Sequence, residues 1–213
     1  MLGQNHGGLP CLRFMGRWNL RCEGPAAELT SDYFDARFKI LREPLGFLPN
    51  AARLPDDEDA IHAWIESDEM PVVAVGRIHL IPADSCGSCA DTVDEDAAHC
   101  PDFPPLANEG LEDAAGNPFP HLDTIRPAVQ VRQMGTLTAH QRKGHASAIL
   151  IALEEAAVDC WGDCTGFLQA RVAAISFYES QGWVCFDGEY MVDGIGLHRS
   201  MWKSLKDSQM GGE

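Results

Sequence analysis

The stretch QRKGHAS at residues 141–147 lies between two segments of different character. The residues before it, AVQVRQMGTL (128–137), are typical of a strand. The residues after it, ASAILIALEEAAV (146–158), predict a helix, because one face collects the apolar side chains of Ala146, Ile149, Leu150, Leu153 and Ala157. The stretch is therefore predicted to be a loop that leads from a strand into a helix.

Such a loop can hold an anion, because the first backbone N–H groups of a helix have no partner and the helix dipole is positive there. Gly144 lets the backbone come close to a ligand, and Ala146 is too small to block it. Arg142, Lys143 and Ser147 can add side-chain contacts. The alternative is an ordinary strand–helix turn with exposed basic residues.

Overall charge gives this basic loop its interest. The net charge of −16 argues against broad nucleic-acid binding, which needs a basic footprint. An anionic ligand would need a local basic patch that works against this charge. Neither G-x-x-x-x-G-K-[ST] nor G-x-G-x-x-G is present, so a P-loop NTPase and a dinucleotide-binding fold are not expected.

The length of 213 residues suggests one domain with additions. We expect a flexible tail over 1–15, a domain over 16–206 and a short tail over 207–213. Within the domain, 83–125 holds ten acidic residues and no Lys or Arg, which indicates a long, mobile insertion. No apolar run is long enough to span a membrane, and the start does not resemble a secretory signal, so a cytoplasmic protein is expected.

Strands and helices alternate in the second half. We predict strands over 17–23, 166–171, 183–192 and 196–205, a hairpin over 60–66 and 70–82, and helices over 29–47 and 173–181. In the first helix Phe34, Phe38, Leu41 and Leu45 share one face, and Ser31 is the expected N-cap. This order predicts an α/β or α+β fold with a mixed sheet.

A second motif, ARVAAISFYESQGW (170–183), gives the loop a family context. The chain resembles the GNAT superfamily of acyl-CoA N-acetyltransferases, whose phosphate loop reads Q/R-x-x-G-x-G/A and whose later motif reads N-x-x-A-x-x-F-Y-x-x-x-G-F. Gln141, Gly144 and Ala146 match the first pattern. The second is matched by Ala174, Phe177, Tyr178, Gly182 and Trp183. The resemblance covers residues 17–205 apart from the acidic insertion.

The resemblance implies a fold and a cofactor. The fold would be a splayed, mostly antiparallel mixed sheet flanked by helices, with acetyl-CoA in a V-shaped gap between two central strands. Backbone groups of Met134, Gly135 and Thr136 would bond the pantetheine arm. The pyrophosphate would lie on Gln141, Arg142, Lys143, Gly144, His145, Ala146 and Ser147. Arg171 replaces the family's asparagine, so it would contact a phosphate or point to solvent.

The implied reaction is direct transfer of acetyl from acetyl-CoA to a primary amine of a small molecule or peptide. Tyr178 would lie near the sulfur and protonate the departing thiolate, since a phenol is protonated at neutral pH. The strand 128–137 has no glutamate to act as the base. His198 and Glu189 are the candidates, followed by His79, and a chain of waters could replace them. Homodimers are common in the family.

The acidic insertion leaves several readings open. Cys86, Cys89, His99 and Cys100 could bind zinc, although free thiols are favoured and a disulfide is a further alternative. The carboxylates could attract a cationic acceptor, or simply be solvated. For the whole chain, the alternatives to an enzyme are a non-catalytic acyl-CoA sensor and an interaction module built on a metal-stapled insertion.

Overall fold

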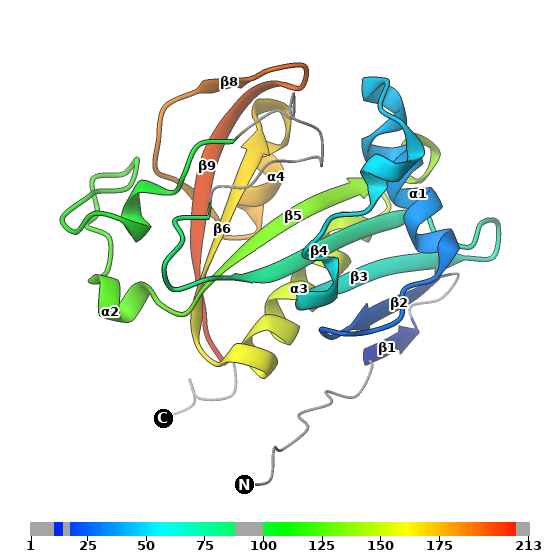
Figure 1. The fold of residues 1–213 in the computed structure, drawn as a ribbon, viewed down its shortest axis with the longest axis horizontal. Coiled ribbons are helices and arrows are strands. Elements are labelled where there is room, and N and C mark those ends of the chain that lie inside the picture. The colour runs from blue at the N-terminus through cyan, green and yellow to red at the C-terminus, as the bar shows by residue number, and fades with distance from the viewer. Residues whose placement is uncertain (1–10, 15–17, 88–99, 208–213) are drawn as a thin grey trace, which may run out of the picture.

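One mixed sheet forms the centre of the protein in this computed structural model, which describes residues 11–14, 18–87 and 100–207 (Figure 1). Within these residues the strand order is β1-β2-β3-β4-β5-β6-β9-β7, and β8 pairs with β9. Neighbours are antiparallel except β5 and β6, which are parallel. The strands are β1 Cys11–Phe14, β2 Trp18–Glu23, β3 Ala60–Ser67, β4 Ala74–Ile81, β5 Ala128–Thr136, β6 Cys164–Arg171, β7 Val184–Cys185, β8 Tyr190–Val192 and β9 Gly196–Leu205. The predicted mixed, mostly antiparallel sheet is confirmed.

Helices cover both faces of the first half of the sheet. These are α1 Ser31–Leu41 on one face and α3 His145–Trp161 on the other, whereas α2 Leu122–Ile125 belongs to the insertion and α4 Ile175–Ser180 packs near β6. Helix α3 packs Ile149 and Leu153 in one core cluster with Ile61 and Ile65 of β3. The intervening Trp64 points to the other face, where it packs with Tyr33 of α1. Because both faces are covered, β3 and β4 are buried along most of their length. None of the helices described here is long and apolar enough to cross a membrane.

The start of the domain differs from the expected tail over 1–15. Cys11–Phe14 forms β1, which pairs antiparallel with β2 from Cys11 opposite Cys22 to Phe14 opposite Asn19. An edge strand of four residues is held by backbone hydrogen bonds to its neighbour, and so short a run leaves little periodicity to read. The other residues of both predicted tails lie largely outside the described part of the chain.

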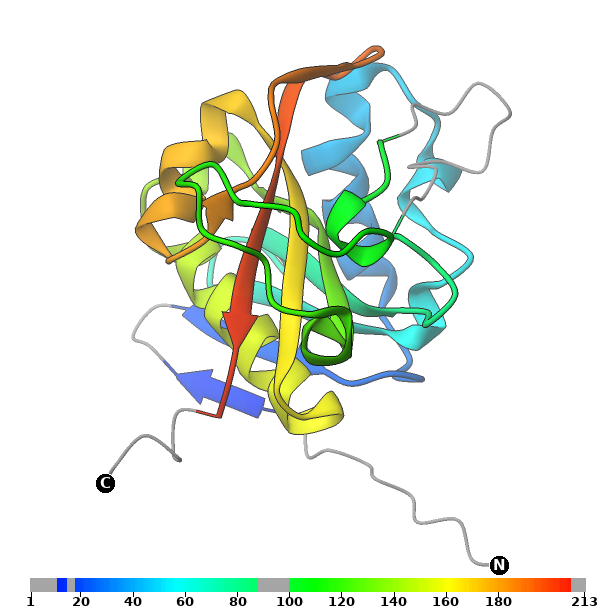
Figure 2. The same cartoon turned by 90° about the vertical axis from the view of Figure 1, so that its left-hand side faces the viewer.

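The insertion over 83–125 also differs from its prediction, because much of its described part is packed. Phe103, Phe119 and Ile125 are buried in a second core cluster with Phe167 of β6. The rings of Phe103 and Phe167 stack with centroids 5.0 Å apart. Figure 2 shows this segment lying across β6 and β9. These three side chains are separated by proline and glycine and hold the loop without helical or strand periodicity. The hydrophobic pattern of the sequence therefore did not predict their burial.

Two local details also depart from expectation. The N-cap of α1 is Thr30, whose Oγ1 accepts a hydrogen bond from the Tyr33 amide at 3.3 Å, rather than Ser31. The predicted strand over 183–192 is two short strands, β7 and β8, which pair with different parts of β9. The segment between them turns at Asp187, whose carboxylate accepts the backbone N–H of Ser200 at 2.7 Å.

A buried ionic cluster lies beneath β3 and β4. Asp57 accepts hydrogen bonds from Nη1 of Arg37 at 2.8 Å and from Nη1 of Arg77 at 2.6 Å. Arg77 also forms an ion pair with Asp56. The ring of His62 joins the cluster, with Nδ1 2.9 Å from the Tyr33 hydroxyl and Nε2 2.8 Å from the backbone oxygen of Asp57. Both guanidinium side chains are fully buried.

The buried histidines make stability depend on pH. Burial lowers the pKa of His62 to about 4, and burial together with the charge of nearby Arg77 lowers that of His79 to about 3. In the unfolded chain both titrate near the ordinary value of about 6.5. Below that pH the unfolded state binds more protons than the folded state, so acid favours unfolding.

We therefore expect the free energy of unfolding to fall as the pH drops from about 6.5 towards about 4, by up to about 1.4 kcal/mol per histidine per pH unit. Urea unfolding at pH 7 and pH 5 measures this. A His62→Gln variant should show a smaller difference between the two pH values, whereas His121→Gln, at an exposed position, should match the unmodified protein. Equal stability of the unmodified protein at both pH values would contradict the assignment.

Candidate active site

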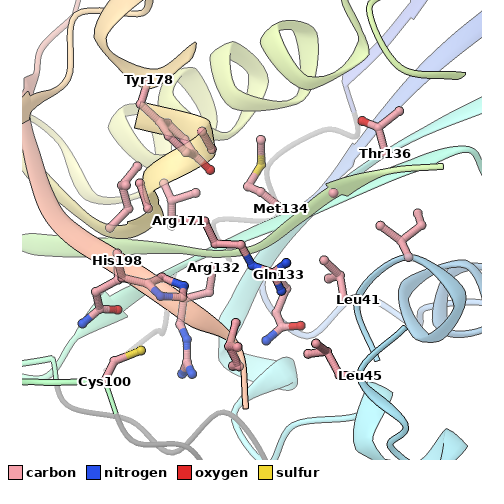
Figure 3. Close-up of a pocket in the computed structure, with 18 of the residues that line it drawn as sticks. Leu41, Leu45, Cys100, Arg132, Gln133, Met134, Thr136, Arg171, Tyr178 and His198 are labelled. Carbon is pink, nitrogen blue, oxygen red and sulfur yellow. The ribbon is translucent and has the colours of Figure 1, made fainter. Parts of the chain in front are cut away.

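The candidate site is the gap that opens between the two parallel strands. β5 and β6 pair only over Ala128–Gln130 and Thr165–Phe167, and they diverge beyond those residues. A cavity of about 300 Å³ lies where they separate (Figure 3). The residues that line it are Ile40, Leu41, Arg42, Leu45, Cys100, Val131, Arg132, Gln133, Met134, Gly135, Thr136, Gln141, Leu168, Gln169, Ala170, Arg171, Ala174, Tyr178, Ile195 and His198.

A β-bulge in β5 helps to open the gap. Opposite β4, the register shifts between the pairs Arg132–Arg77 and Gly135–Val75, and Gln133 has a φ of +55°. A bulge bends its strand and increases the local twist, so it directs β5 away from β6. Gly135 is required just beyond it, because a Cβ there would clash with Ile40 and Leu41 of α1. The predicted pantetheine contacts, Met134, Gly135 and Thr136, all line the cavity.

The loop 141–147 has the geometry expected of an anion site. Arg142 and Gly144 are in left-handed conformations, with φ of +59° and +83°, and α3 begins at His145. Gly144 has open space where a Cβ would lie. Arg142 and Lys143 are exposed, and Ala146 and Ser147 are partly so. Gln141 lines the cavity and donates from Nε2 to the Thr136 oxygen at 3.3 Å. The loop thus adjoins the open end of the gap.

The His145 side chain does not share in that surface. Its ring is 3% exposed and meets Trp18 edge-on, with centroids 5.1 Å apart. Burial lowers its pKa, and the neighbouring His140 and Lys143 lower it further. Among the described residues, no hydrogen-bond partner reaches its Nδ1. Of the contacts predicted for His145, the buried side chain is not available, which leaves the backbone N–H at the first residue of α3.

Tyr178 lies where the sequence placed it, on α4 with its ring against the cavity. The ring packs edge-on against Phe177 and Trp183, with centroids 4.9 and 6.4 Å away. Burial raises the pKa of the Tyr178 phenol to about 12. The hydroxyl is therefore protonated across the physiological pH range. Figure 3 shows the side chain reaching toward the gap near Met134.

The three predicted bases are separated by the structure. His198 lines the cavity and is 6% exposed. Its Nδ1 lies 2.8 Å from the Gly196 oxygen, and a carbonyl only accepts, so Nδ1 carries the proton and Nε2 is the basic nitrogen in the neutral ring. Glu189 is exposed and is not part of the lining. His79 is buried elsewhere beside Arg77 at 3.2 Å, and its low pKa makes it a poor base.

The lining also includes residues that sequence reasoning missed. Arg42 is 2% exposed at the end of α1, and Arg132 is 8% exposed on β5. Gln169 bridges the strands to the insertion: it accepts from Nε2 of Gln130 and donates to the Pro101 oxygen, both at 2.9 Å. An arginine inside a central strand of an acidic chain is a signal that could have identified Arg132.

The insertion reaches the cavity through Cys100. Two members of the proposed zinc set, Cys89 and His99, lie outside the described residues, while Cys86 and Cys100 are described and partly exposed. Within the described ranges, no group of three or more His, Cys, Asp or Glu side chains could hold a metal ion. Arg171, at the end of β6, is exposed and lines the same cavity opposite His198 in the β6–β9 register.

Comparison with known proteins relates this geometry to a known fold. Residues 115–205 match the sequence model of the acetyltransferase (GNAT) domain. The chain has the GNAT fold. The predicted resemblance to the GNAT superfamily is confirmed, and that fold supports an acyl-CoA-dependent N-acyltransferase activity. No curated protein sequence matches the chain closely enough to count as a relative.

Solved structures with the GNAT fold superpose over most of the chain. An acyl-CoA N-acyltransferase from Pseudomonas aeruginosa matches with a TM-score of 0.55 and 16% identity, covering 87% of this chain and 99% of that one. Arabidopsis thaliana NAA60 in complex with acetyl-CoA matches with 0.56 and 10%, covering 87% and 98%. The Escherichia coli ribosomal-protein-S18-alanine N-acetyltransferase matches with 0.53 and 12%, covering 91% and 99%. At these identities the likeness establishes the fold.

Proposed function

We propose that this protein transfers an acetyl group from acetyl-CoA to a primary amine of a small molecule or peptide by direct attack. The observation that carries the proposal is the cavity between the diverging strands β5 and β6. The loop 141–147 lies at one end of it, and Tyr178 and His198 both line it. The acetyl-CoA complex of NAA60 shows a protein of this fold with that co-substrate.

The acyl-CoA would lie along β5 and the loop. Backbone groups of Met134, Gly135 and Thr136 would bond the pantetheine, and the first amides of α3 would bond the pyrophosphate. Arg142 and Lys143 would add charge to the phosphate contacts. A backbone N–H of β5 beyond the bulge would donate to the developing oxyanion, an arrangement that needs no reorganisation during the reaction.

In the transfer step, the amine nitrogen forms a bond to the thioester carbon and the carbon–sulfur bond breaks. His198 takes the amine proton at Nε2, because its Nδ1 proton is held by the Gly196 oxygen. Tyr178 faces the leaving thiolate. With a phenol pKa of about 12 and a thiol pKa of about 8.5, full proton transfer from Tyr178 is uphill by about 5 kcal/mol, so its main contribution is a hydrogen bond to the sulfur as negative charge develops.

The test is turnover with purified protein. Acetyl-CoA would be incubated with a panel of amines, free thiol would be measured, and mass spectrometry would identify the acylated amine. Amine-dependent thiol release with an acetylated product is expected. Longer acyl-CoA donors in parallel test the choice of acetyl, and light scattering tests the homodimer that the resemblance implies. Hydrolysis alone, with no acylated amine, would contradict the proposal.

A further inference from the structure

The charges around the cavity are opposite to the charge of the chain. The sequence has 32 acidic and 16 basic residues, yet the described residues that line the cavity include three arginines and no Asp or Glu. We propose that the acceptor is a free amino acid with an apolar side chain, and so an amine that also carries a carboxylate. Arg42 and Arg132 recognise this carboxylate. The inference rests on the proposed function and specifies the substrate of the same site.

Arg42 and Arg132 reach the cavity from different elements. Arg42 caps the C-terminus of α1, where its backbone N–H donates to the Phe38 oxygen at 2.8 Å, and its guanidinium lies 5.8 Å from the centre of the Phe47 ring. Arg132 lies on β5 immediately before the bulge. Figure 3 shows Arg132 on the His198 side of the cavity, with Leu41 and Leu45 across from it. A substrate held by these residues would lie beside the proposed base.

These guanidinium groups suit a carboxylate. Both also interact within the chain. Each guanidinium has five N–H donors, so an interaction in the protein leaves donors for a ligand. Arginine binds carboxylates through two parallel hydrogen bonds and keeps its charge when buried. Contacts with these guanidinium groups would therefore offset the free-energy cost of desolvating a carboxylate bound between α1 and β5. They would also fix the orientation of the amine.

A cationic acceptor fits this lining poorly. The acidic residues of the insertion suggested such an acceptor, but Cys100 is the part of that segment that reaches the cavity among the described residues. A second cation beside buried guanidinium groups would be repelled in a medium of low dielectric constant. The apolar lining from Leu41, Leu45 and Ile195 instead provides a surface for an aliphatic side chain.

The anion could in principle be a phosphate instead of a carboxylate. The phosphates of the acyl-CoA have their own site at the loop, where Arg142 and Lys143 are exposed, so they do not account for Arg42 and Arg132. A phosphorylated amine remains a distinct chemical source, and the experiment must separate it from an amino acid.

The unmodified protein provides the first test. Acetyl transfer would be compared for leucine, its decarboxylated counterpart 3-methylbutylamine, and O-phosphoethanolamine. We expect kcat/KM for leucine to exceed that for 3-methylbutylamine by about 10-fold or more, because a charge-assisted contact is lost with the carboxylate. Equal or better use of 3-methylbutylamine overturns the inference. Better use of O-phosphoethanolamine than of leucine overturns the carboxylate assignment.

Variants locate the recognition. Arg132→Gln and Arg42→Gln should each lower kcat/KM for leucine by about 10- to 100-fold, mainly through KM, and change kcat/KM for 3-methylbutylamine by less than about threefold. Arg21→Gln is the control, because Arg21 pairs with Glu66 away from the cavity. Equal losses with both acceptors would indicate a structural role and overturn the inference.

A binding experiment covers the case in which the variants do not fold. Calorimetry of the unmodified protein with acetyl-CoA should be followed by titration with 4-methylpentanoate, which is leucine without its amine, and with the neutral 4-methylpentanamide. Binding of 4-methylpentanoate but not of 4-methylpentanamide supports the inference. Acetyl-CoA binding without 4-methylpentanoate binding overturns it while the proposed function stands, whereas failure to bind acetyl-CoA removes the proposed function itself.

Discussion

A Tyr178→Phe variant is expected to lose about 100-fold or more in kcat while its affinity for acetyl-CoA changes by less than about threefold. The substitution removes only the hydroxyl and keeps the ring that packs against Phe177 and Trp183. A hydrogen-bond donor aimed at charge that develops in the transition state contributes about 10²- to 10³-fold. Because the phenol pKa is about 12, the hydroxyl is the only form of Tyr178 available to the reaction at neutral pH.

Steady-state kinetics beside calorimetry would measure both effects. Tyr33→Phe is the matched control, because Tyr33 is also a buried tyrosine but bonds to His62 and does not line the cavity. Its kcat should be unchanged where the variant is folded. An unaltered kcat in Tyr178→Phe would remove this residue from the mechanism. If the unmodified protein binds acetyl-CoA but shows no turnover with any amine, the protein would be a sensor.

An Asp57→Ala variant is expected to lower the free energy of unfolding by about 3–5 kcal/mol. The carboxylate is shared by two fully buried guanidinium groups, those of Arg37 and Arg77, and its other oxygen accepts the Leu54 amide at 2.8 Å. Removing it leaves two buried charges with less compensation. The loss is large beside the total stability of an ordinary domain, about 5–15 kcal/mol.

Urea unfolding would give the difference in stability. Glu66→Gln is the comparison, because Glu66 pairs with Arg21 at the surface and exposed pairs contribute about 0–1 kcal/mol. The neighbouring Asp56 belongs to the same cluster: burial opposes its ionisation, but the hydrogen bond and charge of Arg77 lower its pKa to about 2. A loss below about 1 kcal/mol in Asp57→Ala would show that the cluster does not stabilise the fold as described.

Much of the fold followed from local patterns. Apolar periodicity located α3, and β-branched runs located the β3–β4 hairpin, because each element buries one or both faces. The edge strand β1 and the packing of the aromatic residues of the insertion could not be predicted from such patterns. Phe103 and Phe119 are held by distant partners on β6 and β9, and tertiary contacts of this kind leave no local period.

The site shows the same division. The loop 141–147 and Tyr178 could be predicted because short motifs encode a turn with a left-handed glycine and a helix that presents a phenol. The buried ring of His145 and the exposed position of Glu189 could not, since each depends on what packs around it. Arg42 and Arg132 line the same cavity because α1 packs on β5 at Gly135.

The most direct test of an acyl-CoA site along β5 and the loop 141–147 is calorimetric titration of acetyl-CoA into the unmodified protein and two variants at Gly144. With φ at +83°, this position tolerates asparagine far better than a bulky residue, and the space beyond it is open. We expect the unmodified protein and Gly144→Asn to bind acetyl-CoA and a folded Gly144→Trp to lose binding, because the indole would occupy the phosphate position. Undiminished binding by Gly144→Trp, or none by the unmodified protein, would contradict the account.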